Sequence, residues 1–548
     1  MKNKVLLISL AVVLALSVGL IGCGGVEYNL TISSTAGGSV TTPGVGNFTY
    51  DKGTVVNLVA TPSAGYYHFV NWTGDVGTIA DVNDATTTIT MNGNYSITAE
   101  FVKVIRVGLA RDLDESLSVF ECYGAGPVYR WFADKVNADG GIYLSDYDAD
   151  VQIELKVRDF DVMTWDLAAV TQTLILTDRC DFIWGGPGTD CIFTQAPVCN
   201  AHGVPLITLE GGASSMIWDG DIDSWPYVWV SSSFANWNQI PVLHDMLDAE
   251  LDHDPVAFIT YIGGMGATLG IEYRNEIIAE FGANYTIDAG FHSYDLSSSP
   301  GAADAIIAAA KTALGNATDP NYDIFCAFTY PWNVAALTQA CIDNEFNPPA
   351  ILFGLGANFG SFGAPPPDGF GAANVEGIMC FAVANNKTTV NVVNATMSMA
   401  EMYDAIANQI EDEWGVVLAC ASGNLTSGEQ ALDYWGTPCY VAALEMWKKA
   451  VEAAGNLSSL AVRNALAAFS PSNPAQTVFG DTWYTVFGDG YGGGVLAYEC
   501  HTGEIGQWQS GVIEIVGYDG INATLPNYCV TANFTYPMTD LWGWLSPG

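Results

Sequence analysis

Basic residues are scarce in this sequence. Only 17 Lys and Arg stand against 59 Asp and Glu in 548 residues, which gives a formal net charge of −42 at pH 7. A surface of this sign repels nucleic acid phosphates and anionic lipid headgroups. The acidic residues are spread along the chain and do not form a tail. We therefore exclude nucleic acid as a partner and attribute the acidity to an exported, soluble surface, not to the ligand.

Motifs typical of enzymes are also missing. The sequence contains no GxSxG elbow, no HExxH, no Walker loop and no GxGxxG that opens a βαβ unit. Its six His are scattered singly, and carboxylates are so frequent that chance pairs carry no glycosidase signal. We expect a protein that is not an enzyme and that needs no cofactor.

Cysteine spacing does not indicate a metal site. Cys180, Cys191 and Cys199 are close in sequence, but they lack the paired CxxC spacing or the His partners of a zinc site. We predict no metal. Eleven of the 12 Cys follow Cys23, and an odd number leaves at least one unpaired even in an oxidising compartment. The disulfide connectivity cannot be inferred from spacing.

Long apolar runs are confined to the N terminus. Lys2 and Lys4 precede the apolar residues 5–22, a layout typical of a secretory signal peptide. The residues LIGC that end at Cys23 resemble a bacterial lipobox, which implies a signal peptide over residues 1–22, a lipid on Cys23 and attachment to the outer face of the cell membrane. A plain transmembrane anchor is the alternative reading of the same run. Asp, Asn, Gly or Pro interrupts every later apolar stretch.

Residues 28–103 show strand and turn chemistry without helical periodicity. Short alternating runs at 55–60 and 87–91 are separated by Gly, Pro, Asn and Asp, which predicts a small all-β module. The stretch GGSVTTPGVGNFTYDKGTVVNLVATPSAGYYHFVNWTG resembles a bacterial extracellular B-repeat, a family that implies a spacer or adhesion role. Its aromatic residues suit either a small core or a sugar-binding platform: Tyr66, Tyr67, Phe69 and Trp72.

From residue 104 onward, strands alternate with amphipathic helices. This alternation predicts an α/β fold with parallel sheets covered by helices on both faces, and ligands bind such sheets at the carboxyl ends of the strands. The expected strands are residues 104–110, 151–157, 180–185, 204–209, 256–261, 324–328 and 351–355. The expected helices are residues 126–137, 167–176, 271–281, 302–314 and 333–344.

Several blocks in order resemble the type I periplasmic binding proteins that serve branched-chain amino acid, amide and aromatic-acid transport. They are VIRVGLARDLD, FADKVNADGGI, DFIWGGPGTDCIFTQAPVCNAHGVPLITLEGGAS, DIFCAFTYPWNVAALTQACIDNEFNPPAILFG and TPCYVAALEMWKKAVEAAG, within residues 104–509. The resemblance implies two doubly wound, Rossmann-like lobes that close on ligand as a hinge. It places crossovers near 227–233, 379–384 and 482–490, with lobe 1 at about 104–228 and 385–481 and lobe 2 at about 233–378 and 490–548.

A glycine-rich turn in the first lobe suits an anionic group. GGPGTD, residues 185–190, follows a buried strand and precedes a helix, so backbone amides and the Thr189 hydroxyl would meet a carboxylate at the helix N terminus. Tight turns are the less favoured alternative for the same glycines. By family position, the carboxylate subsite is implied to comprise Gly188, Thr189, Gly211, Gly212 and Ser214.

The facing lobe departs from the amino acid binders. Tyr330, next to Trp332, stands where the family places an aromatic ring over the ligand, although packing between domains would also suit it. Family position further implies ligand contacts for Phe120, Glu121 and Met265, where Met265 replaces a tyrosine. Residues 354–358, GLGAN, contain no acid to hold an ammonium. A buried ammonium without a partner costs several kcal/mol, so an α-amino acid is disfavoured unless Glu121 or Glu210 substitutes.

These features together predict a function. The resemblance implies an extracytoplasmic solute-binding lipoprotein that captures a small carboxylate-bearing solute, either an amino acid, an amide or an aromatic or aliphatic acid, and delivers it to the permease of an ABC transporter. The alternative is a surface sensor or adhesin that has kept the binding fold without a transporter.

Overall fold

The structure is a computed structural model, and it divides the chain into two compact units, Met1–Val104 and Ile105–Gly548. At a few positions only the backbone is described, Thr189 and Trp332 among them. The described residues are 25–63, 67–113, 121–161, 164–186, 189–208, 222–231, 257–262, 274–275, 278–279, 286–292, 300–314, 324–329, 331–346, 348, 350–354, 356–366, 368–388, 397–414, 425–497, 500, 505–517 and 532–533.

The described residues of the N-terminal unit, 25–63 and 67–104, form strands and no helix, which confirms the predicted β module. One sheet has the order β5-β7-β1-β3 and the other β2-β4-β6. Trp72 is 1% exposed, and its Nε1 donates a hydrogen bond to the carbonyl of Asp84 at 3.1 Å, so this aromatic is core and not a sugar platform. The strands are β1 (Glu27–Ser34), β2 (Gly38–Thr42), β3 (Gly46–Asp51), β4 (Val55–Pro62), β5 (Tyr67–Gly74), β6 (Thr86–Thr90) and β7 (Tyr95–Arg111).

Strand β7 serves both units. Its first residues pair with β1 and β5, whereas Val107–Leu109 pair in parallel with β10 (Phe182–Trp184). Any truncation at the boundary near Val104 therefore cuts through a continuous strand.

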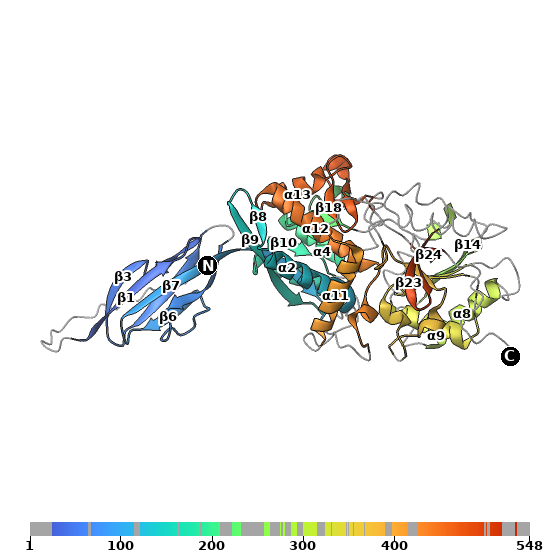
Figure 1. Cartoon of the computed structure of the whole chain (residues 1–548), viewed down its shortest axis with the longest axis horizontal. Coiled ribbons are helices and arrows are strands. Elements are labelled where there is room, and N and C mark those ends of the chain that lie inside the picture. The colour runs from blue at the N-terminus through green and yellow to red at the C-terminus, as the bar shows by residue number, and fades with distance from the viewer. Residues whose placement is uncertain are drawn as a thin grey trace, which may run out of the picture. The chain divides into compact units, whose positions relative to one another are not determined.

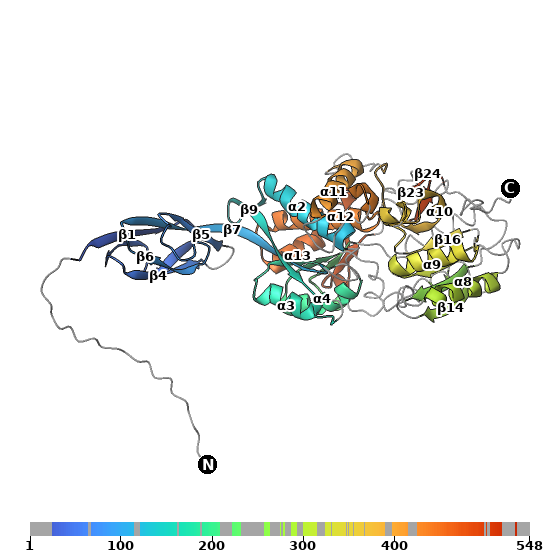
Figure 2. The ribbon, with the colours of Figure 1, turned by 90° about the horizontal axis from the view of Figure 1, so that it is seen from below.

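The first lobe of the C-terminal unit has a mainly parallel sheet of order β20-β21-β12-β11-β10-β7, with β8 and β9 added beside β7. Helices α2 and α12 pack against each other on one face, and α3 and α4 pack together on the other (Figure 2). The remaining strands are β8 (Ile142–Leu144), β9 (Ala149–Asp159), β11 (Leu206–Thr208), β12 (Val228–Val230), β20 (Tyr484–Val486) and β21 (Gly494–Leu496). The helices are α2 (Gly126–Ala138), α3 (Leu167–Leu176), α4 (Thr189–His202), α11 (Met399–Glu413), α12 (Gly436–Ala454) and α13 (Ser459–Ala468).

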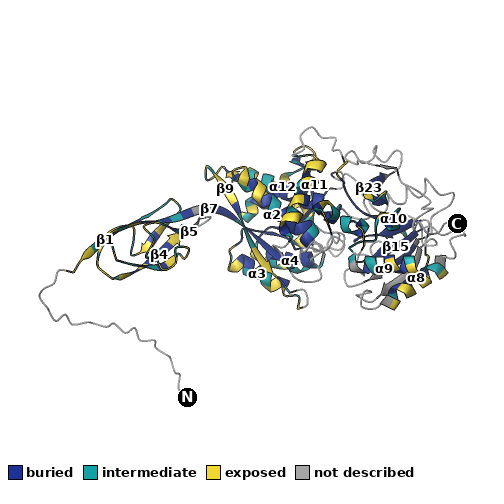
Figure 3. Ribbon diagram, turned by 60° about the horizontal axis from the view of Figure 1, so that its bottom comes forward, coloured by how far each residue is buried: buried dark blue, intermediate teal, exposed yellow. Residues whose placement is uncertain are grey.

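The second lobe has a sheet of order β14-β13-β15-β16-β17-β22-β23-β24, parallel as far as β17. Helices α8 and α9 lie side by side next to this sheet, and α8 exposes residues on its outer face (Figures 1 and 3). The strands are β13 (Ala257–Ile262), β14 (Thr286–His292), β15 (Ile324–Phe328), β16 (Ala350–Phe353), β17 (Met379–Phe381), β22 (Ile505–Gln509), β23 (Val512–Gly517) and β24 (Ala532–Asn533). The helices are α8 (Pro300–Leu314), α9 (Pro331–Asp343) and α10 (Ala372–Val375).

The chain passes between the two sheets three times: between β12 and β13, after β17, and between β21 and β22. The third passage corrects the expectation of a crossover near 482–490 and of a second lobe that resumes at 490. Strand β21 pairs in parallel with β12 and antiparallel with β20, so the first lobe continues to Leu496. The Gly-rich residues 488–493 form the turn of a hairpin, and local turn chemistry does not specify which sheet receives the following strand.

Candidate functional site

The carboxyl ends of β7, β10, β11 and β12 meet at one edge of the first-lobe sheet, because these strands are parallel. Ligands of open α/β sheets bind at such an edge. The described residues that end or follow these strands are Arg111 and Asp112, Gly185 and Gly186, Thr208 and Ser231. We call this set the carboxyl edge of the first lobe.

The Gly185–Gly186 turn at this edge is held firmly. The Tyr129 hydroxyl donates to the carbonyl of Gly185 at 2.8 Å, and the amide of Gly186 donates to Oε1 of the buried Gln195 at 2.8 Å. A Cβ on Gly185 would lie 2.3 Å from Oγ1 of Thr208, so only glycine fits there. Because α4 begins three residues after Gly186, the turn leads directly into a helix N terminus, where negative charge is favoured.

Most of the ligand contacts that the sequence predicts lie outside the described residues. Thr189 is described through its backbone alone, as the first residue of α4. These contacts therefore stay predictions, as does lipidation. Outside the described residues are Cys23, Phe120, Gly188, Gly211, Gly212, Ser214, Met265 and Tyr330.

Glu121 belongs to a buried ionic cluster behind the end of β7. Its carboxylate accepts a hydrogen bond from Nε of Arg111, and the two side chains are 1% and 2% exposed. Nη2 of Arg111 also lies 3.6 Å from Oε2 of Glu413, at the end of α11. Nε of Arg130 on α2 lies 3.1 Å from Oε1 of the same Glu413. The cluster therefore joins β7, α2 and α11, which are far apart in sequence.

Burial dominates the electrostatics of this cluster. It raises the pKa of Glu121 to about 7, with Arg111 opposing the rise and Glu413 and Asp112 adding to it. The cluster also explains why residue 126, at the start of α2, is a glycine, because a Cβ there would lie 2.0 Å from Nη2 of Arg111. Since the Glu121 carboxylate already has a cationic partner, it is poorly suited to replace a missing acid opposite a ligand ammonium. Its contact with ligand stays a prediction.

In the second lobe, Asn358 lies in the loop after β16 and forms its side-chain hydrogen bonds within the protein. Oδ1 of the fully buried Asn358 accepts from the amide of Gly356 at 2.6 Å, and its Nδ2 donates to Oδ1 of Asp433 at 2.7 Å. Oδ1 of Asp433 also accepts from the amides of Trp435 and Gly436 at 2.9 Å, at the start of α12. The hydrogen bond between Asn358 and Asp433 thus connects a second-lobe loop to a first-lobe helix.

Sequence reasoning missed Asp433 and Glu413 as partners in these networks. Burial raises the pKa of Asp433 to about 6, against the hydrogen bonds from Gly436, Trp435 and Asn358. The Asp433 side chain accepts from amides two and three residues further on, a turn that Asp favours, so its local role was open to prediction. Glu413 carries no comparable signal, because its partner Arg111 lies about 300 residues away in sequence.

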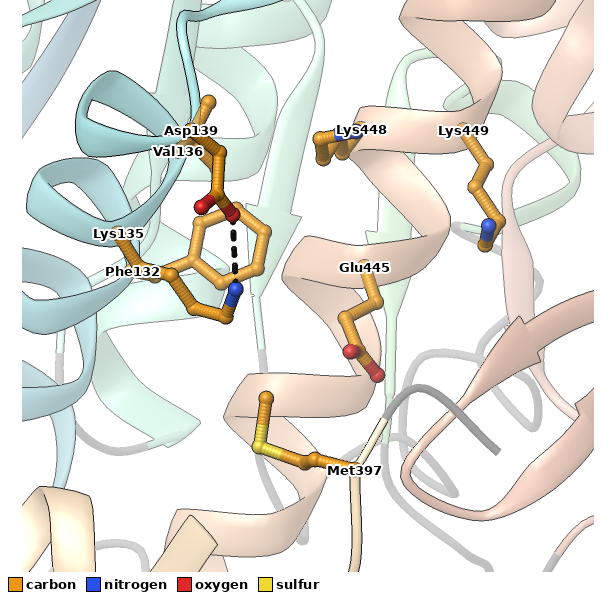
Figure 4. Close-up of a pocket in the computed structure, with 8 residues that line it drawn as sticks. All are labelled: Phe132, Lys135, Val136, Asp139, Met397, Glu445, Lys448 and Lys449. Atoms are coloured by element: carbon orange, nitrogen blue, oxygen red, sulfur yellow. Dashed lines mark hydrogen bonds and ion pairs between the residues drawn. The ribbon is translucent and has the colours of Figure 1, made fainter. Parts of the chain in front are cut away.

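A pocket of about 160 Å³ lies between α2 and α12, and its lining mixes apolar and charged side chains (Figure 4). Nζ of Lys135 contacts the Asp139 carboxylate at 2.8 Å, and Glu445 accepts from the amide of Val478 at 2.7 Å, so both acids are already engaged. The second half of α2 lines this pocket, whereas the helix starts near the end of β7. The pocket is therefore remote from the carboxyl edge. Its lining residues are Phe132, Lys135, Val136, Asp139, Met397, Glu445, Lys448 and Lys449.

Each of the two units matches the model of a known protein family. The model of the divergent InlB B-repeat domain matches residues 28–105, and the model described as periplasmic binding protein matches residues 123–485. The chain belongs to the periplasmic binding protein family. Members of this family are extracytoplasmic solute-binding proteins and not enzymes. No curated protein matches the sequence.

Solved structures agree with a periplasmic binding protein of type I. The branched-chain amino acid substrate-binding protein LivJ of Streptococcus pneumoniae, in complex with isoleucine, is 15% identical, with a TM-score of 0.51 over 75% of this chain and 98% of that one. A leucine-binding LivK of Thermotoga maritima is 13% identical, with a TM-score of 0.50 over 75% and 97%. An ABC transporter solute-binding protein of R. palustris, in complex with 4-hydroxybenzoate, is 13% identical, with a TM-score of 0.51 over 81% and 100%. Identities this low establish the fold alone.

No helix within the described part of the chain combines the length and the apolarity that a membrane span requires.

Proposed function

We propose that this periplasmic binding protein captures a small carboxylate-bearing solute between its lobes and delivers it to the permease of an ABC transporter. The observation that supports a carboxylate-bearing ligand is the fixed Gly185–Gly186 turn. Tyr129 and Gln195 hold its backbone, and α4 begins three residues later. The amides of Gly185 and Gly186 donate to Ile207 and Gln195, so the turn itself is rigid and fixes the position at which α4 begins. The N terminus of that helix favours an anion without a reorganisation cost. In this proposal the carboxylate contacts are Gly188, Thr189, Gly211, Gly212 and Ser214.

The solute we favour is an aromatic or apolar acid that lacks an ammonium group. Two observations support this choice. Residues 354–358 contain no acid, and Asn358 is committed to Gly356 and Asp433. Glu121 is committed to Arg111. A solved relative in fold binds 4-hydroxybenzoate, and we carry this ligand class over as part of the proposal. Tyr330 would cover the ring, with Phe120 and Met265 beside it.

Attachment to the membrane is the second part of the proposal. The signal peptide over residues 1–22 and acylation of Cys23 would tether the protein at the outer face of the cell membrane. The B-repeat-like unit then acts as a spacer between the anchor and the binding body. Its core residue Trp72 is buried, which suits a structural role.

The B-repeat-like unit also favours one second candidate function. A B-repeat on a solute-binding fold suits a surface sensor or adhesin that senses the same solute without delivering it. Reconstitution with a candidate permease separates the two, because only a transport protein stimulates uptake.

A thermal shift screen of the whole mature chain tests the ligand class. Residues from Cys23 onward are used intact, because a cut near Val104 would divide β7. A ligand that binds only the folded state adds about 2.7 kcal/mol at a hundredfold excess over its Kd. We expect hits among aromatic and aliphatic carboxylates. Hits restricted to α-amino acids would contradict the proposed ligand class. Absence of a shift in both panels would contradict solute capture and leave the adhesin role.

A further inference from the structure

A second pocket of about 160 Å³ lies where elements of the two lobes meet. One wall comes from α11 of the first lobe. The opposite wall comes from β23 of the second lobe and from the passage after β17, where Asn385 donates to the carbonyl of Ile513 on β23 at 2.9 Å. The segment before α12 completes the lining. The lining residues are Asn385, Asn386, Lys387, Tyr403, Asp404, Glu429, Leu432, Tyr434, Val512 and Ile513.

Two tyrosine rings form an aromatic surface in this pocket. The ring centroids of Tyr403 and Tyr434 are 5.4 Å apart, and their planes are inclined by 39°. Tyr403 is 2% exposed, and its hydroxyl donates to the carbonyl of Ala384 at 2.8 Å, which fixes the ring. Tyr434 is only partly buried, and among the described residues its hydroxyl has no hydrogen bond. The negative faces of such rings attract a cation.

Negative charge exceeds positive charge around these rings. Lys387, the one basic residue of the lining, forms an ion pair with Glu514 of β23. Asp404 and Glu429 are exposed at the rim, and within the described part of the chain neither has an ion pair. Burial raises the pKa of Tyr434 to about 12, and the negative charges of Glu429 and Glu514 add to the rise.

We propose that this interlobe pocket binds an organic cation, namely a primary ammonium on a short apolar chain. The ammonium lies over the ring of Tyr434, the more exposed of the two tyrosines, between the carboxylates of Asp404 and Glu429. The apolar chain packs against Leu432 and Val512. The net charge of −42 raises the local concentration of cations around the protein and so assists binding. This site goes beyond the solute site and does not depend on it.

Because its walls come from both lobes, an occupied pocket joins them. The amide of Val383 donates to the carbonyl of Tyr434, and the amide of Tyr434 donates to the carbonyl of Asn358, so the backbone around the pocket is part of the connection between the lobes. A cation that contacts α11 and the residues after β17 at the same time restricts their relative motion. Local opening of these backbone hydrogen bonds then becomes rarer.

The test is a titration of the whole mature protein with n-butylammonium chloride, followed by saturation-transfer NMR of the ligand. Potassium chloride at equal ionic strength and neutral n-butanol serve as ligand controls. The test variant carries Asp404→Asn and Glu429→Gln. The matched control carries Asp134→Asn and Asp412→Asn, which remove two negative charges from exposed helix positions away from the lining.

We expect n-butylammonium to bind the wild type and the control variant, and to bind the test variant at least tenfold more weakly. Amide hydrogen exchange at Val383 and Tyr434 should slow in the presence of n-butylammonium, whether or not a solute occupies the main cleft. Equal binding to the test variant, or an equal response to n-butanol or potassium chloride, would overturn the proposal. The screen with carboxylates is independent, so failure of the solute-binding function would be seen separately.

Discussion

Arg111 and Glu121 form an ion pair at the end of β7 with less than 3% of either side chain exposed to water. Desolvation of both charges is costly, and Glu413 adds a second carboxylate on the same guanidinium. Two charges are therefore kept out of water at the end of β7, where the predicted ligand contact Glu121 lies.

The first prediction concerns pH. The pKa of Glu121 is raised from 4.5 in the unfolded chain to about 7 in the fold, so the folded state binds more protons between these values. The contribution of Glu121 to the free energy of unfolding is therefore full below about pH 4.5 and falls as pH rises through about 7. Its size is on the order of 3 kcal/mol.

Chemical denaturation of the wild type and of Glu121→Gln between pH 4 and pH 8 measures this contribution. The difference between the two proteins should change over that range, because Gln cannot titrate. Parallel pH profiles would show that Glu121 is not the group responsible.

A second prediction concerns Gly126. In Gly126→Ala, the new Cβ would lie 2.0 Å from Nη2 of Arg111 and 2.3 Å from Oε1 of Glu121. We expect a loss of about 1 to 3 kcal/mol in the free energy of unfolding, because the buried pair has to shift. Gly301→Ala in α8 is the matched control, since a Cβ there meets nothing within 4 Å. Equal effects of the two substitutions would contradict the tight packing at Gly126.

A third prediction concerns the connection between Asn358 and Asp433. Asn358→Ala should cost about 1 to 3 kcal/mol, because it leaves the amide of Gly356 and the carboxylate of Asp433 with one partner fewer. A double-mutant cycle with Asp433→Ala, measured by urea denaturation, should give a coupling energy of at least about 0.5 kcal/mol. Additive effects would mean that the hydrogen bond does not connect the two lobes energetically.

The fourth prediction concerns the solute site. Tyr330→Ala and Thr189→Ala should each weaken binding of the solute found by thermal shift by about 1 to 3 kcal/mol while leaving the fold intact. Calorimetric titration measures the affinity, and circular dichroism checks the fold. Tyr491→Ala is the control, because Tyr491 is 79% exposed in the hairpin turn of the first lobe. Unchanged affinity in both test variants would contradict the proposed site.

The local sequence pattern was sufficient to predict many elements of the fold. The expected strand over residues 324–328 and the expected helix over residues 167–176 coincide with β15 and α3. The strand is a short continuous apolar run, and the helix buries Leu167, Thr171 and Leu174 at helical spacing, so neighbouring residues alone specify both. The helix α11 was not foreseen, although Ser398 and Glu401 form a capping box at its start.

The candidate site was less accessible to sequence reasoning. The Gly185–Gly186 turn could be expected, because glycines after a buried strand are a local signal. The partners that hold it, Tyr129 and Gln195, could not, since hydrogen bonds across a fold leave no mark on spacing. Glu121 was predicted as a ligand contact, but its ion pair with Arg111 became evident only in three dimensions.

By itself the sequence determined the acidic composition, the B-repeat-like unit and the alternation of strands and helices that is typical of a periplasmic binding protein, because each depends on composition or on residues close together in the chain. Tertiary structure alone decided that β21 pairs with β12, that Glu413 meets Arg111, and that Asn358 bonds to Asp433. Sheet pairing and buried charge partners depend on which distant segments the hydrophobic core brings into contact, and the free energy of those contacts exists only once the chain has folded.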